Sequence, residues 1–211
     1  SGHKREYDYE GQTNGTPSDA KGMRNVNDPP GGYLWDNALK HKVDFINYGM
    51  YMAEGVPIKT PDGSNVADDN TIAMKAFEGR IDPNYRMYDL SYADSDMWEK
   101  MGRTFPKRRE TYGLNAAKSR FSQWKSEYDR LVRADKVPPL MLVRFGNNHT
   151  QGTAPGFPDP GSMIADNDYA VGQLLEAVST GPLWKRTAVV IMEDDAQGGY
   201  DHVDGHRSIC F

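Results

Sequence analysis

The sequence has little of what would assign a protein to a class at a glance. Its 211 residues include one cysteine, Cys210, which excludes an intrachain disulfide framework. No apolar run approaches the roughly 20 residues that a membrane-spanning helix needs, and no signal peptide is visible. The net charge of -5 is mild, whereas proteins that bind nucleic acids usually carry a basic face. We therefore expect a globular chain with neither a transmembrane segment nor a nucleic-acid partner.

What is present indicates an α/β domain with much loop relative to core. The mean hydropathy is -0.76, and the chain has 21 glycines and 13 prolines. We expect residues 1–54 to begin the core, 55–113 to form a loop-rich insertion and 114–211 to form a β-α-β core. The first residues are polar and the last resemble the start of a strand. We therefore expect residues 1–211 to form a single, partial domain, which is an internal fragment of a complete one.

Hydrophobic periodicity predicts the main helices and strands. A helix is expected from about Leu34 to Lys42, followed by a strand over 43–48. Asn115 is expected to cap a long helix, whose apolar stripe comprises Phe121, Trp124, Tyr128 and Leu131. Asp166 or Asn167 is expected to cap a second helix, over 168–180. The apolar runs 140–145 and 187–192 are typical of buried parallel strands.

Carboxylates and imidazoles gather directly after the second of these strands. The cluster comprises Glu193, Asp194, Asp195, Asp201, His202, Asp204 and His206. Gly198 and Gly199 allow the chain to turn back, so that the acids and the histidines can converge. Two adjacent ionised carboxylates repel each other unless a cation lies between them. The pattern therefore favours a divalent metal site over a solvated acidic loop.

Topology predicts one more ligand from a distant part of the chain. Asn148 and His149 follow the strand 140–145, and the carboxyl ends of parallel strands meet at one edge of a sheet. We therefore expect His149 to join Asp194 and Asp195 in one crevice. Asn148 is expected to be a weak ligand or to hydrogen-bond a substrate oxygen. Mixed nitrogen and oxygen ligands suit zinc or manganese, and a mostly carboxylate shell suits calcium.

Three stretches of the sequence resemble a known family. They are residues 146–156, residues 163–172 and residues 193–207, and the upstream pieces 7–11 and 28–36 agree with them. Together they resemble the bacterial phosphoesterase family, which includes phospholipase C-like and acid-phosphatase-like enzymes and belongs to the alkaline phosphatase superfamily. The resemblance spans nearly the whole chain.

The resemblance implies a fold, a reaction and a set of ligands. The fold would be an alkaline phosphatase-like α/β sandwich, with a mostly parallel central sheet flanked by helices. The activity would be metal-dependent hydrolysis of a phosphate ester or a phospholipid head group, through a covalent phospho-enzyme. Asp194 and Asp195 would be metal ligands, with His202 or His206 from the following loop. Glu193 and Asp201 would contact the substrate or support the ligands. The resemblance also implies a secreted, periplasmic or cell-surface protein.

Two departures from the family pattern leave an alternative open. Members of the family usually carry Asp-His where this chain has Asn148 and His149. Their nucleophile precedes the stretch that begins here, so we expect it outside this chain, and we expect the remaining part of the same domain as a partner. The alternative function is a non-catalytic metal-binding or assembly module on the same scaffold. A carbohydrate-binding domain is a third hypothesis, which rests on the tyrosines and tryptophans of 85–128.

Overall fold

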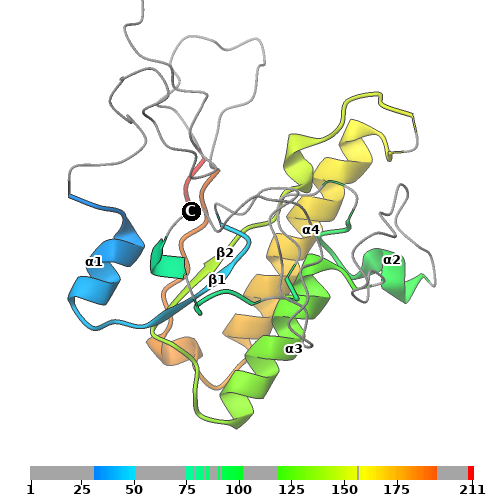
Figure 1. Cartoon of the computed structure of the whole chain (residues 1–211). Coiled ribbons are helices and arrows are strands. Elements are labelled where there is room, and N and C mark those ends of the chain that lie inside the picture. Colours follow the sequence, from blue (N-terminus) through cyan, green and yellow to red (C-terminus); the bar gives the residue numbers. More distant parts are fainter. Residues whose placement is uncertain are drawn as a thin grey trace, which may run out of the picture.

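The computed structural model of this chain has a small parallel sheet between two layers of helices (Figure 1). The structure describes residues 31–50, 75–77, 79–82, 84–85, 90, 92–101, 118–155, 157–193 and 209–211. Within them, helices and parallel strands alternate along the chain, which confirms a mixed α/β architecture. Much of the expected insertion over 55–113 lies outside these residues, so the predicted division of the domain stays a prediction.

The sheet joins two of the three predicted strands, those expected over 43–48 and 140–145. Strand β1 (Phe45–Tyr48) and strand β2 (Leu140–Val143) are parallel, with Phe45 opposite Leu140 and Tyr48 opposite Val143. Residues 80–82 continue the sheet beyond β1, since the amide of Asn47 donates to the carbonyl of Arg80 over 2.7 Å. The carboxyl ends of β1 and β2 therefore lie at the same edge.

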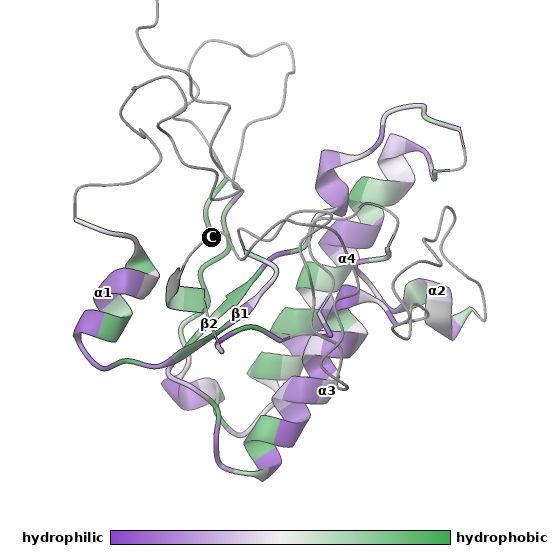
Figure 2. Cartoon of the chain, viewed as in Figure 1, coloured by the Kyte–Doolittle hydropathy of each residue, from purple (hydrophilic) through white to green (hydrophobic). Residues whose placement is uncertain are grey.

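One face of the sheet is covered by the two long helices, α3 (Arg120–Arg133) and α4 (Pro160–Ser179). The predicted stripe of α3 is buried, and three of its members, Phe121, Trp124 and Tyr128, pack into one apolar cluster. The other buried members of this cluster are Tyr48, Tyr85, Ala170 and Val178. The rings of Trp124 and Tyr128 stack with their centroids 4.9 Å apart. Figure 2 shows the hydrophobic residues of both helices grouped on part of each surface, with hydrophilic residues on the rest.

The other face is covered by α1 (Leu34–Lys40) and the short 3-10 helix η2 (Lys75–Phe77). Trp35, Ala38, Phe45 and Phe77 form a second buried cluster, against which Leu140 and Leu142 of β2 pack. The neighbours Met141 and Val143 belong to the first cluster instead. Alternate residues of β2 thus fill opposite layers, as a strand buried on both faces requires.

Both long helices begin elsewhere than the sequence suggested. Helix α3 is capped by Ser119, whose Oγ accepts from the amide of Ser122 over 3.0 Å, and Asn115 lies outside the described residues. Helix α4 is capped by Asp159 and starts with Pro160, eight positions before the expected start. A capping acid followed by proline at the first helical position is a strong start signal. Asp166 and Asn167 consequently lie inside α4, and their prediction as caps was wrong.

The strand pairing of residues 187–192 also differs from the expected one, which was parallel. This segment follows the short helix η5 (Trp184–Arg186) and is extended, but residues 191–193 pair with 209–211 in the antiparallel sense. The amide of Ile191 donates to the carbonyl of Phe211 over 2.9 Å, and Phe211 donates back over 2.8 Å. The described parallel partner of β2 is β1, so β1, α3 and β2 form the β-α-β unit.

The described aromatic residues of 85–128 are largely core residues. Tyr85, Tyr92, Phe121, Trp124 and Tyr128 are all buried. Since a sugar-binding surface needs exposed rings, these residues give no support to the carbohydrate-binding hypothesis. The short helix α2 (Met97–Lys100) lies nearby and presents Met97 to solvent.

Within the described ranges, no helix is both long enough and apolar enough to cross a membrane.

Candidate functional site at the end of β2

Three of the eight predicted site residues are described, and five are not. Asp194, Asp195, Asp201, His202 and His206 lie outside the described residues. Asn148, His149 and Glu193 lie within them. The predicted meeting of His149 with the paired aspartates therefore stays a prediction. What the structure does give is the local setting of His149 and Glu193.

His149 lies on an exposed turn that directly follows β2. The turn is the 3-10 helix η4 (Asn147–His149), in which Asn148 and His149 are exposed and Asn147 is buried. Nδ1 of His149 lies 3.0 Å from the carbonyl oxygen of Thr150. A carbonyl can only accept, so this hydrogen bond requires the proton on Nδ1. In a neutral ring the lone pair is then on Nε2, which is the tautomer of many metal-binding histidines.

The residue after His149 has a strained backbone. Thr150 has φ 59 and ψ 171, a combination that is essentially restricted to glycine. Its Oγ1 accepts a hydrogen bond from the amide of Gly152 over 3.2 Å, which helps to hold this conformation. Strain of this kind costs about 1–3 kcal/mol and is concentrated at functional sites. The turn that carries His149 is therefore fixed in one shape at some cost in stability.

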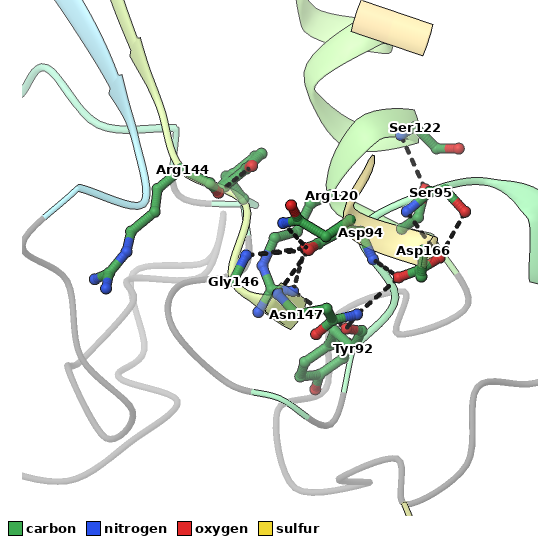
Figure 3. A network of polar contacts seen from close by, with 12 residues as sticks. Tyr92, Asp94, Ser95, Arg120, Ser122, Arg144, Gly146, Asn147 and Asp166 are labelled. Atoms are coloured by element: carbon green, nitrogen blue, oxygen red, sulfur yellow. Dashed lines mark hydrogen bonds and ion pairs between the residues drawn. The ribbon is translucent and has the colours of Figure 1, made fainter. Parts of the chain in front are cut away.

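Beneath the turn lies a buried carboxylate, Asp94, which is fully shielded from solvent (Figure 3). Its Oδ2 accepts from the backbone amides of Gly146 and Asn147, over 3.1 and 2.7 Å. Its Oδ1 lies 2.7 Å from Nη1 of Arg120, at the start of α3. Nδ2 of Asn167, on α4, donates to Oδ2 over 2.9 Å. Asp94 thus joins the end of β2 to both long helices.

A second buried carboxylate, Asp166, extends this network from α4. Its Oδ2 accepts from the amide of Asp94 over 2.7 Å, and its Oδ1 accepts from the amide and the hydroxyl of Ser95. Nδ2 of Asn147 also donates to Oδ2, over 2.7 Å. Burial raises the pKa of the Asp166 carboxyl above its ordinary value of 3.8, and the hydrogen bond from Ser95 opposes that shift.

Asn147 connects the turn to this buried network through its side chain. Besides Asp166, its Nδ2 donates to the carbonyl of Tyr92 over 3.1 Å. Both partners can only accept, so the orientation of the amide is fixed. Its Oδ1 is buried and accepts no hydrogen bond from any described residue. The network as a whole, which we call the Asp94 network, comprises Tyr92, Asp94, Ser95, Arg120, Gly146, Asn147, Asp166 and Asn167.

The carboxylates of the Asp94 network are structural rather than a second metal site. A metal ligand needs lone pairs directed at the ion, whereas the oxygens of Asp94 and Asp166 are occupied by N–H and O–H donors. Among the described residues, no group of three or more acids, histidines or cysteines has the arrangement that holds a metal ion. The chemistry of the predicted set, two aspartates and three imidazoles, nevertheless fits a divalent cation.

Comparison of the chain with models of protein families, with curated proteins and with solved structures gives no significant match. The resemblance to the bacterial phosphoesterases stays a prediction.

Glu193 lies at the end of the extended segment that leads to the acidic cluster. Its amide donates to the carbonyl of Ile209 over 3.1 Å, and its side chain is partly buried. Val189 of the same segment packs against the cluster that holds Val143 of β2 and Ala170 of α4. The segment before Asp194 is therefore anchored on the same core as the strand before His149.

The Asp94 network was not foreseen from the sequence, although one signal for it existed. Met163, Asp166, Ala170 and Gln173 are all buried on α4, and their spacings of three and four residues put them on one helical face. A polar residue inside an otherwise buried stripe indicates a buried hydrogen-bond network. The partner segment, 92–96, has no periodicity that could have identified Asp94.

Proposed function

We propose that this chain carries the metal-binding part of a metal-dependent hydrolase of phosphate esters, on an alkaline phosphatase-like sandwich. In this proposal His149 joins Asp194, Asp195, His202 and His206 around a divalent cation. The observation that carries the proposal is the presentation of His149. It is exposed at the carboxyl end of a parallel strand, on a strained turn above the buried Asp94 network.

The features around His149 favour a ligand over an ordinary loop histidine. Its Nδ1 contact with the carbonyl of Thr150 directs the lone pair of the neutral ring to Nε2. The carboxyl end of a parallel strand is the usual location of sites in α/β proteins. When bound, a zinc, manganese or calcium ion would polarise a phosphoryl oxygen of the substrate. Asn148 is exposed beside His149, where its amide can donate to an oxygen of the same substrate.

The substrate class follows from the resemblance and from the donors. Phosphate monoesters, phosphate diesters and phospholipid head groups all present anionic oxygens to a cation and an amide. The nucleophile is expected outside this chain. Hydrolysis by this chain alone is therefore a more demanding test than metal binding, and the two measurements have to be made separately.

The second candidate function is a metal-binding module without turnover, and Asn148 favours it. The bacterial phosphoesterases usually have an aspartate at this position. An amide in place of that carboxylate removes a negative charge next to the predicted cation. Such a module would bind metal as the first proposal predicts but would hydrolyse no phosphate ester.

Elemental analysis of the purified chain, with hydrolysis of p-nitrophenyl phosphate before and after chelation, tests both functions. We expect about one or two equivalents of metal, and loss of most of it in Asp194→Asn and in His149→Ala. Asp168→Asn is the matched control, because Asp168 is an exposed aspartate on α4 outside the predicted ligand set. Bound metal with hydrolysis favours the first function, and bound metal alone favours the second. No metal, even after addition of zinc, manganese or calcium, contradicts both.

A further inference from the structure

We infer that Asn147 is a positioning residue, through which the Asp94 network holds the backbone turn that presents His149. The inference rests on the proposed function for the ligand role of His149, but its structural part can be tested without a metal. Asn147 contacts neither a substrate nor a cation here. It acts through the shape of the turn.

The backbone of the turn is held at residues that Asp94 fixes. The amide of His149 donates to the carbonyl of Gly146 over 3.1 Å, and the amide of Thr150 donates to that of Asn147 over 3.0 Å. The two accepting residues, Gly146 and Asn147, are those whose own amides are held by Asp94. The described backbone hydrogen bonds of the turn therefore end on residues that the buried carboxylate fixes.

The side chain of Asn147 links the turn to other segments. Its two N–H groups reach Asp166 on α4 and the carbonyl of Tyr92, so one amide ties the turn to two other segments of the chain. Asn147 is fully buried while its neighbour Asn148 is exposed. Burial with two directed hydrogen bonds fixes a side chain much more tightly than exposure does. A ligand supported in this way is pre-organised for an ion.

The charges around Asn147 favour an amide at this position. The position of Asn147 requires a donor, because it faces the carboxylate of Asp166 and, through its backbone amide, that of Asp94. An aspartate there would bring a third carboxylate against Asp166 and the carbonyl of Tyr92, with no N–H to offer either. The substitution Asn147→Asp keeps the size of the side chain and reverses its hydrogen-bonding character.

The test compares two chemically identical substitutions at adjacent positions of the full chain. Asn147→Asp breaks the buried contacts, whereas Asn148→Asp changes an exposed side chain of the same turn. Each protein is titrated with Co²⁺, followed by visible absorption, and the ring signals of His149 are recorded by NMR without metal. We expect Asn147→Asp to weaken Co²⁺ binding about tenfold to a hundredfold, as the loss of an outer-sphere support does. It should also shift and broaden the signals of His149.

Asn148→Asp is expected to shift and broaden the signals of His149 much less than Asn147→Asp does, and to bind Co²⁺ at least as tightly as the wild type. Ser95→Ala serves as a milder variant in case Asn147→Asp fails to fold, because it removes one hydroxyl contact with Asp166 and leaves the others. It should produce a smaller shift in the same direction. If the chain binds no Co²⁺, the proposed function fails, and the metal-free NMR signals still decide this inference. A folded Asn147→Asp protein, or Ser95→Ala if it replaces it, with wild-type His149 signals overturns it.

Discussion

Asn147 and His149 are two residues apart and lie in opposite environments. Asn147 is fully buried, and its N–H groups are directed at fixed acceptors. His149 is exposed, and the next residue has a backbone conformation that few residues adopt. The comparison shows how a site can be rigid at its base and accessible at its surface. The buried half fixes the geometry of the turn, and the exposed half faces solvent.

The largest effect is expected from removing the carboxylate of Asp94. In Asp94→Ala, the amides of Gly146 and Asn147 lose their acceptor, and a buried guanidinium loses its counter-charge. Breaking a buried ion pair on one side costs about 3–5 kcal/mol, so the free energy of unfolding in urea should fall by about that amount. Asp44→Ala is the control, because Asp44 pairs with Arg80 at the surface and its loss should cost less than about 1 kcal/mol. Equal losses in the two variants would contradict the central role of Asp94.

A smaller change in the free energy of unfolding is expected when the pH is varied in the acid range. Burial raises the pKa of Asp166 above 3.8, so the folded chain takes up this proton more readily than the unfolded chain. The contribution of Asp166 to stability should therefore fall as pH rises from 3.8 through the raised pKa, and then level off. Urea unfolding at several pH values should show the stability of wild type relative to Asp166→Asn decreasing over that window. A relative stability that increases with pH there would show that the pKa is lowered instead.

Asp168→Asn is the companion variant for this measurement, since it removes the same charge from an exposed position of α4. The difference between the two asparagine variants then isolates the effect of burying the carboxyl group.

The smallest effect is expected on the exposed side, at Thr150. Thr150→Gly removes the side chain that disfavours φ 59, and Thr150→Ala keeps a Cβ at the same position. Both remove the hydroxyl that Gly152 contacts. Glycine normally makes a protein less stable than alanine does, by about 0.4–1 kcal/mol, because it increases the freedom of the unfolded chain. Here we expect the reverse order by up to about 1 kcal/mol in urea unfolding. The normal order would show that the turn carries no strain.

The strands and the apolar face of α3 were predictable because they depend on local periodicity. Leu140–Val143 is a continuous apolar run, and the stripe from Phe121 to Leu131 has helical spacing. The start of α4 differs from the prediction because Asp159, Pro160 and Gly161 have the composition of a loop as well as a helix start signal in the first two. The pairing of 187–192 depends on residues 209–211, and sequence spacing alone carries no information about that partner.

The site was predictable only in part, for a related reason. The location of His149 directly after a strand was predictable because it depends on a local signal, and its role as a ligand stays a prediction. The support beneath it joins Asp94, Arg120, Asn147 and Asp166, which are separated by up to 72 positions. Such contacts arise from the packing of helices on the sheet, and each residue alone resembles an ordinary surface polar residue. Only the helical spacing of Asp166 with Ala170 and Gln173 indicated that it is buried.

The most direct test of the account is an NMR spectrum of the chain with bound Co²⁺, because paramagnetic cobalt shifts the ring protons of its histidine ligands far from their usual positions. The account predicts strongly shifted signals for His149, which disappear in Asp194→Asn and remain in Asp168→Asn. Bound Co²⁺ with the ring signals of His149 unshifted would contradict it, because the turn at the end of β2 would then present its imidazole to something other than this cation.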